Sequence, residues 1–305
     1  MEIKGILVTA LAPFENHIAN GGEKLLGNAS SIKRRPDGRV YVSGQMQRHV
    51  LFSAIDRLNT SDPDKKETFV SNGDGISNLI ENDLRADMGG FMHPSKGDYS
   101  GRRTAPLSVT PAVALGESSV GRDLLVRIKF DQTSDSKDQA LATKEFSEHD
   151  LMHMNFFLDI SALSISKAFE YKNSFNLGTK YFKHADEIER KRRANLYLEA
   201  TKSMNDYASQ ARNAVSGEPQ KVLIVMDTIL SRKASRYFVA SEQEQENILA
   251  ELKARGAEYF FGDDTTENSV YMAYQKALNF LKSNTLYDPS NDAEITSFEK
   301  AFGSE

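Results

Sequence analysis

The stretch RVYVSGQMQRHVLFSAIDRL, residues 39–58, decides the fold that the sequence predicts. Its first four residues are typical of a short strand, and Ser43 is a residue type that caps helix N-termini. Apolar residues then recur at helical spacing. They are Met46, Val50, Leu51, Ala54, Ile55 and Leu58. The stretch therefore predicts a strand that leads into a helix with one buried face, and Arg48 and Arg57 lie off that face.

The rest of the chain supplies further strands and helices around this stretch. The predicted strands are residues 3–12, 105–116 with an interruption at Pro111, 124–130, 151–163 and 221–230. The other predicted helices are a short one near 76–85, a long one over 182–213 and an acidic helical tail from about 241. Residues 14–40 are expected to form a long loop and residues 131–150 a mobile, polar hairpin tip. The order of the elements predicts an α+β protein with a ferredoxin-like, RRM-type βαββαβ core, a common RNA platform.

Composition excludes several classes of protein. The 305 residues contain no cysteine, which excludes disulfides and thiolate metal sites, and no apolar run is long enough for a transmembrane helix. We therefore expect a cytoplasmic protein without a membrane partner. The net charge of −5 is unevenly distributed, because residues 240–305 hold 13 acidic and five basic side chains. The remainder carries about +3, and seven of its Lys and Arg residues fall within 24–57. Such a local basic surface is what phosphate binding needs.

The start of the helix at residue 43 is the first candidate binding site. Ser43 and Gln45 stand where free backbone N–H groups favour an anion, and Arg48, one turn later, could pair with the same phosphate. The alternative is that Ser43 is only an N-cap and Arg48 only a surface charge. Further candidates for phosphate contact are Arg102, Arg103, Arg122, Arg127 and Lys129. Phe91 and Met92 could stack on bases, or they could be core residues.

Motifs for enzymatic chemistry are missing from the sequence. There is no HExxH pattern, no Walker phosphate loop and no GxGxxG. His149 and His153 could share a helix face as metal ligands, but no third ligand has suitable spacing. We therefore expect no catalytic residues, no metal site and no cofactor.

The stretch NGGEKLLGNASSIKRRPDGRVYVSGQMQRHVL, residues 20–51, resembles the opening of the Cascade backbone subunit in the Cas-seven group of CRISPR-associated proteins, in particular its DevR-like autoregulator branch. The family pattern is a glycine/asparagine loop, a basic strand entry, and then Ser-x-Gln-x-x-[Lys/Arg] opening a helix. Here these are Gly27-Asn28, Lys33-Arg34-Arg35, and Ser43, Gln45 and Arg48. Three later segments are also similar to the family, so that the resemblance spans roughly residues 1–240. They are DMGGFM (87–92), TKEFSEHDLMHMNFFLDI (143–160) and SRKASRYF (231–238).

The resemblance implies an RRM-like palm, an inserted finger region and a β-hairpin thumb. The corresponding residues are 1–60, 105–116 and 151–240 for the palm, 61–104 for the finger and 117–150 for the thumb, with 241–305 as an acidic helical extension. Family members polymerise along a guide RNA, and each thumb reaches over the RNA beneath a neighbour. The implied partners are therefore guide RNA, a target DNA strand that pairs with it, further copies of the chain and other Cascade subunits. The implied RNA contacts include Lys24, Asn28, Lys33, Arg34, Arg35, Ser43, Gln45, Arg48, His49, Lys233 and Arg236.

One departure from the family bears on catalysis. Related subunits of RNA-cleaving complexes carry an acidic catalytic residue in the loop before the basic strand entry. Here Ala29 stands at that point, with Asn28 beside it. The resemblance thus implies a non-catalytic subunit. Two alternatives stay open: a backbone subunit that cleaves target RNA, and a DNA-binding transcriptional autoregulator, for which no helix-turn-helix pattern is present.

Overall fold

The chain folds as a mixed α+β protein with several β-sheets, which confirms the predicted class. The computed structural model describes residues 1–25, 29–73, 77–93, 101–130, 137–172, 175–211, 213–291 and 293–302. The helix predicted from the stretch 39–58 is α1 (Gly44–Ser61), and Ser43 is its N-cap. The short strand before it is β5 (Tyr41–Val42).

The largest sheet has β2 at its centre. Its main strands, in spatial order, are β15 (Glu258–Asp263), β14 (Lys221–Asp227), β2 (Gly5–His17) and β11 (Lys137–Asp159), followed by β8 (Leu107–Val109) and β9 (Ala112–Ala114). All these neighbours are antiparallel, and Val8 of β2 stands opposite Phe156 of β11 and Ile224 of β14. The break between β8 and β9 falls at Thr110 and Pro111, as the proline predicts, since its nitrogen cannot donate to a ladder.

Side chains alternate between the two faces of this sheet, and helices cover both faces. One face packs against α1, α3 (Glu187–Lys202) and α5 (Val270–Ser283), and it presents alternate residues such as Ile6, Val8 and Ala10. The opposite face presents Leu7, Leu223 and Val225 to the 3₁₀ helix η1 (Lys233–Val239) and to α4 (Glu242–Ala254). The sheet is therefore the middle layer of three.

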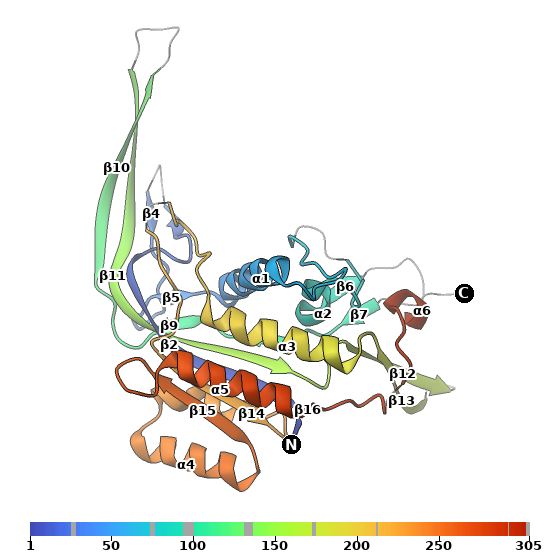
Figure 1. Ribbon diagram of the computed structural model, residues 1–305. Helices are drawn as coiled ribbons and strands as arrows, with labels where there is room; N and C mark the ends of the chain where they lie inside the picture. The colour runs from blue at the N-terminus through green and yellow to red at the C-terminus, as the bar shows by residue number, and fades with distance from the viewer. Residues whose placement is uncertain are drawn as a thin grey trace.

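A long hairpin projects away from this body (Figure 1). It consists of β10 (Val120–Phe130) and the first part of β11, whose last part lies inside the central sheet. Ser147 is the transfer point, because it stands opposite Val120 of β10 and His17 of β2. The prediction of a mobile tip over 131–150 was wrong from residue 137 onward. Residues 137–150 are mostly polar and lack the strict alternation that marks a half-buried strand, so the pattern did not predict a strand there.

Two helix predictions need correction. The long helix runs over α3 and ends at Lys202 instead of extending over 182–213, because Ser203 leaves helical geometry and residues 203–207 are irregular. The short helix near 76–85 is displaced to α2 (Leu84–Gly89), because Asp83 accepts a hydrogen bond from the Arg85 backbone N–H and sets the start. Both boundaries lie in polar stretches, in which the spacing of apolar residues does not show where a helix begins or ends.

The acidic tail is also not entirely helical. Its strand β15 extends the central sheet beside β14, and β16 (Thr285–Leu286) pairs with β1 (Glu2–Ile3) near the N-terminus. The remaining elements are β3 (Glu23–Lys24), β4 (Ser30–Ser31), β6 (Phe91–His93), β7 (Gly101–Arg103), β12 (Ile165–Lys172), β13 (Phe175–Lys183) and α6 (Phe298–Phe302).

Candidate nucleic-acid interface

The start of α1 has the geometry of a capped helix. The Ser43 hydroxyl accepts a hydrogen bond from the backbone N–H of Met46 at 3.2 Å, and the Ser43 N–H donates to Oδ1 of Asn20 at 3.1 Å. The second bond holds Asn20 beside the helix start. Gln45 is exposed there. The Ser43 side chain thus performs the capping role that the sequence left as its alternative.

The Arg48 side chain contacts the C-terminal end of α2 and forms no hydrogen bond with Ser43 in the described structure. Its guanidinium donates to the backbone carbonyl of Gly89 and lies 5.6 Å from the ring centroid of Phe52. Burial lowers the pKa of Arg48, because a charged guanidinium is held partly away from water. Gly89 leaves room for this contact, since a Cβ there would stand 2.5 Å from Arg48 Nη2.

Arg85 shares this location and was missed by the sequence analysis. Its guanidinium carbon lies 4.6 Å from the same Phe52 ring centroid, and its Nε donates to the carbonyl of Ser71 at 2.5 Å. Burial, followed by repulsion from Arg48, lowers the pKa of Arg85. The helix was predicted near residues 76–85, which put Arg85 at its end. Because α2 begins at Leu84 with Asp83 as its N-cap, Arg85 lies in its first turn.

The basic segment before α1 is only partly neutralised. Arg34 pairs with Glu145 of the hairpin at 3.7 Å. In the described part of the chain, Lys24, Lys33 and Arg35 form no ion pair. The Tyr41 N–H donates to the Lys33 carbonyl at 3.4 Å, which holds the segment beside β5 and hence beside the start of α1. Lys33 and Arg35 therefore precede the helix start closely, whereas Lys24 lies on β3, which pairs with β4 beside the hairpin strand β11.

The hairpin carries Arg122, which is exposed and hydrogen-bonded to the same Glu145 at 3.1 Å. One carboxylate therefore faces both Arg34 and Arg122 at the hairpin root. Arg127 and Lys129 belong to β10, but their side chains lie outside the described residues. The same is true of the side chains of Met92 and Arg102, and Asn28 lies outside the described chain altogether.

Arg103 is not available to RNA, contrary to the prediction. It is 7% exposed, and it donates to Asp87 Oδ1 at 2.5 Å and to the carbonyls of Ala162 and Ile165. Asp87 also receives a 2.7 Å bond from Arg193. A buried guanidinium whose hydrogens are used inside the protein cannot contact a phosphate without dismantling this cluster.

Phe91 is likewise a core residue and not a stacking platform. It is 8% exposed and packs edge-to-face on Phe298, with ring centroids 5.2 Å apart. Gly90 before it has φ +67°, and a Cβ there would lie 2.5 Å from the carbonyl of Arg103, so glycine is required at this turn. The DMGGFM segment thus owes its residue types to internal packing.

The remaining predicted contacts lie among acidic groups. Lys233 of η1 forms an ion pair with Glu251 of α4, and the exposed Arg236 acts electrostatically on Glu251 as well. His49 on α1 is exposed and lies 3.8 Å from a carboxylate oxygen of Asp206. The sequence treated the acidic tail as separate from the basic turn at 231–238, whereas α4 packs directly beside it.

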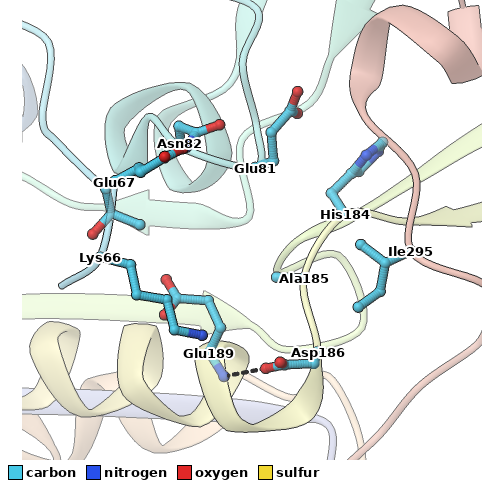
Figure 2. Close-up of a pocket in the computed structure, with 10 residues that line it drawn as sticks. Lys66, Glu67, Glu81, Asn82, His184, Ala185, Asp186, Glu189 and Ile295 are labelled. Carbon is cyan, nitrogen blue, oxygen red and sulfur yellow. Dashed lines mark hydrogen bonds between the residues drawn. The ribbon is translucent and has the colours of Figure 1, made fainter. Parts of the chain in front are cut away.

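A pocket of about 380 Å³ opens at the N-terminal end of α3. Figure 2 shows carboxylates of Glu67, Glu81, Asp186 and Glu189 around it, with Lys66 and His184. The backbone N–H of Glu189 donates to Asp186 at 2.7 Å, so one carboxylate is occupied in capping α3. This excess of negative charge would repel a phosphate backbone.

No cluster of three or more metal-ligating His, Asp or Glu side chains occurs in the described part of the chain. His149 and His153 lie on strand β11 and not on a helix; His149 bonds to Glu15 at 2.6 Å and His153 contacts Thr9 at 3.1 Å. Among the described helices, none combines the length and hydropathy needed to cross a membrane.

Comparison with known proteins connects this geometry to one family. A family model described as CRISPR-associated negative auto-regulator DevR/Csa2 matches residues 14–217. Two solved structures share the fold. One, titled CRISPR RNA-guided surveillance complex, has a TM-score of 0.52 at 14% identity and covers 95% of each chain. The other, titled CRISPR RNA-guided surveillance complex, pre-nicking, has a TM-score of 0.53 at 12% identity and covers 93% of this chain and 96% of that one. No curated protein matches the sequence.

Proposed function

The chain belongs to the CRISPR-associated DevR/Csa2 family, and from this membership we propose that it is a non-catalytic subunit that binds guide RNA along the backbone of a CRISPR surveillance complex. The fold shared with chains of RNA-guided surveillance complexes over nearly their full length supports the proposal. In this role the protein holds the guide, and base pairing by the guide reads the target DNA.

The observation that carries the proposal is the group of unpaired cations beside α1. Lys33 and Arg35 lie in the segment that precedes β5 and the start of α1, Lys24 lies on β3 beside the hairpin, and Arg48 lies on α1 itself. Phosphate contacts need such cations, because each one that neutralises a phosphate releases a counterion. The overall negative charge resides largely in residues 240–305 and does not oppose this local surface.

The proposed palm has support from the sheet topology. Taken in chain order, β2, α1, the β8–β9 pair, β11, α3 and β14 follow a βαββαβ sequence. The spatial order β14, β2, β11, then β8 and β9, is that of an RRM-like antiparallel sheet. Because η1 and α4 cover the face opposite α1 and α3, RNA in this proposal follows the α1 side and the hairpin.

The hairpin β10–β11 is the proposed thumb, and residues 61–104 are the proposed finger. The hairpin projects from the body and exposes Leu124, Val126 and Leu141 by 65%, 54% and 53%. Side chains of this kind on a projecting hairpin suit contact with a neighbouring copy or with unstacked bases. Further copies of the chain and other Cascade subunits are therefore the proposed protein partners.

The absence of catalysis is part of the proposal. Ala29 occupies the position at which cleaving relatives are expected to carry an acid, and its carbonyl accepts a backbone bond from Leu25 at 2.9 Å. Incubating the assembled complex with complementary RNA and Mg²⁺ tests this. Intact RNA is the expected result, and cuts at regular spacing would contradict it.

Guide binding is tested by purifying the protein and extracting its nucleic acid. We expect short RNAs of uniform length to co-purify, and we expect labelled RNAs of unrelated sequence to bind with similar affinity that falls steeply with salt. Purified protein that carries no RNA and fails to bind RNA at 50 mM salt would overturn the proposal.

A second candidate rests on the words "negative auto-regulator" in the family description. It predicts that the isolated protein binds a specific DNA duplex, such as its own promoter, more tightly than unrelated duplexes. A competition assay with promoter and scrambled duplexes separates it from the guide-binding role, which predicts a preference for RNA over both.

A further inference from the structure

We propose that Arg48 and Arg85 form a two-arginine clamp for a single phosphate group at the junction of α1 and α2. The proposal rests on the RNA-binding role above for the source of the phosphate. It places the phosphate site beside Phe52 instead of at the N-cap Ser43. Arg85 is the new residue in this assignment.

Arg48 and Arg85 lack an ion-pair partner within the described residues. Both guanidinium groups lie against one phenyl ring, at 5.6 and 4.6 Å from its centroid. Among the described residues, no carboxylate oxygen lies within ion-pairing distance of either group; Asp56 and Asp83 attract Arg85 only from farther away. Two like charges held together without a partner are unfavourable, and a bound dianion or phosphodiester removes that repulsion.

The two guanidinium groups also keep hydrogen-bond donors for a ligand. Within the described residues, Arg48 donates one hydrogen bond to the carbonyl of Gly89, and Arg85 donates one to the carbonyl of Ser71. A guanidinium has five N–H donors in a planar fork, so most of them stay open for oxygen acceptors. The Ser71 hydroxyl is also buried without a hydrogen-bond partner in the described structure. The site therefore offers donors and positive charge together.

Phe52 supports both guanidinium groups of the clamp. Phe52 is fully buried, and a guanidinium that stacks on an aromatic face keeps its plane while its edge stays open. Arg85 is fixed on α2 by the N-cap Asp83, whose carboxylate accepts from Arg85 N and Ser77 Oγ at 2.9 and 2.8 Å. Asp83 thus spends its hydrogen-bond acceptors on the cap and attracts the Arg85 guanidinium from a distance without forming an ion pair with it.

The test measures RNA affinity by fluorescence anisotropy over a series of salt concentrations. The variants are Arg85→Gln, Arg48→Gln and their combination, with Arg57→Gln as the control. Arg57 is an exposed arginine on the same helix that donates to Asn205 Oδ1 at 2.8 Å, away from Phe52. We expect each single variant to weaken binding about tenfold, and the double variant to lose much less than a hundredfold, because both groups hold one phosphate.

Gly89→Ala provides a variant that keeps both charges. The added methyl would stand 2.5 Å from Arg48 Nη2 and would displace that guanidinium. It would also stand 3.3 Å from Cζ of Phe52, which must give by a few tenths of an ångström, while the helical backbone of α2 tolerates alanine. We expect clearly weaker RNA binding and a small fall in melting temperature. A lower melting temperature together with wild-type RNA affinity in Arg85→Gln and Gly89→Ala would show a structural role and overturn the clamp.

A second measurement separates this inference from the proposed function. Inorganic phosphate should raise the melting temperature of the wild type above that in chloride of equal ionic strength, and Arg85→Gln should abolish the rise. If the wild type binds no RNA but shows this rise, the clamp stands as a free-phosphate site and the guide-binding role fails. If the wild type binds RNA, and Arg85→Gln binds it like Arg57→Gln, the clamp fails and the guide-binding role stands.

Discussion

Two arginine clusters lie on opposite sides of the short helix α2, and they differ in what balances their charge. On one side, Arg103 and Arg193 enclose Asp87, and all three side chains are buried. On the other side, Arg48 and Arg85 lie half-buried over Phe52 and contact backbone carbonyls. The sequence treated Arg103 and Arg48 alike. The difference teaches that the partner of an arginine, and not its presence, decides whether it stabilises the fold or remains free for a ligand.

The strongest test of this contrast is Asp87→Asn. The substitution removes the ion-pair partner of the buried Arg103 and leaves Arg193 with Glu189 alone, and we expect it to lower the free energy of unfolding by about 3–5 kcal/mol. Urea denaturation followed by circular dichroism measures this. The control is Asp123→Asn, which removes an exposed carboxylate from β10. A loss as small as that of the control would mean that the cluster is not the structural half of the pair.

Acid unfolding gives a second, smaller effect from the same carboxylate. Burial alone would raise the pKa of Asp87, but the charges of Arg103 and Arg193 outweigh it and hold the pKa below its usual value. The folded pKa thus lies below the unfolded value of about 3.9, so this stabilisation is complete well above pH 4 and is lost as the pH falls through that range.

We therefore expect the wild-type stability to fall more steeply below about pH 5 than that of Asp87→Asn. Asp150, whose pKa is also lowered because hydrogen bonds from His17 and Ser118 outweigh burial, contributes equally to both proteins and cancels in the comparison. Parallel stability curves from pH 7 to pH 3 would contradict this sign.

The contrast also predicts a reversed pattern for RNA. Arg48→Gln should weaken RNA binding about tenfold, equivalent to about 1.4 kcal/mol, and should lower the slope of log affinity against log salt by about 0.7, while stability changes little. Arg103→Gln should do the opposite, with reduced stability and unchanged affinity of the folded protein. A salt titration below the melting transition decides; equal losses of affinity would erase the distinction.

The smallest effect is expected for Arg122→Gln. Arg122 is exposed, and its guanidinium is already held by the Glu145 carboxylate, which also lies 3.7 Å from Arg34. We expect stability to change by less than about 0.5 kcal/mol and RNA affinity by less than about twofold. Anisotropy at 0.1 M salt measures this beside Arg48→Gln. An equal loss in the two variants would show that an ion pair does not remove an arginine from the RNA surface.

Sequence reasoning was most successful where one face of an element is buried. The apolar stripe of α1 and the capping role of Ser43 follow from spacing and residue type, and the structure confirms both. It failed where polarity has a long-range cause. Nothing near Arg103 in the chain shows that Asp87 and Arg193 will surround it, and nothing near Lys233 shows that α4 will pack beside it. Such partners are set by tertiary contacts.

The site was therefore only partly predictable. Phe91 and Arg103 were assigned to RNA by residue type, and packing assigned them to the interior. Arg85 was missed because it stands in a polar region whose helix boundary was misplaced. The contribution of Asn28, Met92, Arg102, Arg127 and Lys129 stays a prediction, since these residues or their side chains lie outside the described structure.

The continuity of β11 limits how the projecting hairpin can vary in length. At Ser147 the pairing of β11 with β10 ends and its pairing with β2 begins, without a break in the strand, so one continuous strand links the registers of the hairpin and the sheet. If one residue is inserted into β11 on the tip side of Ser147, the side chains between the insertion and the tip turn to the opposite face. Insertions of two residues in each strand would lengthen the hairpin and preserve its faces. The hairpin can therefore change its length without exchanging its two faces only by an even number of residues in each strand.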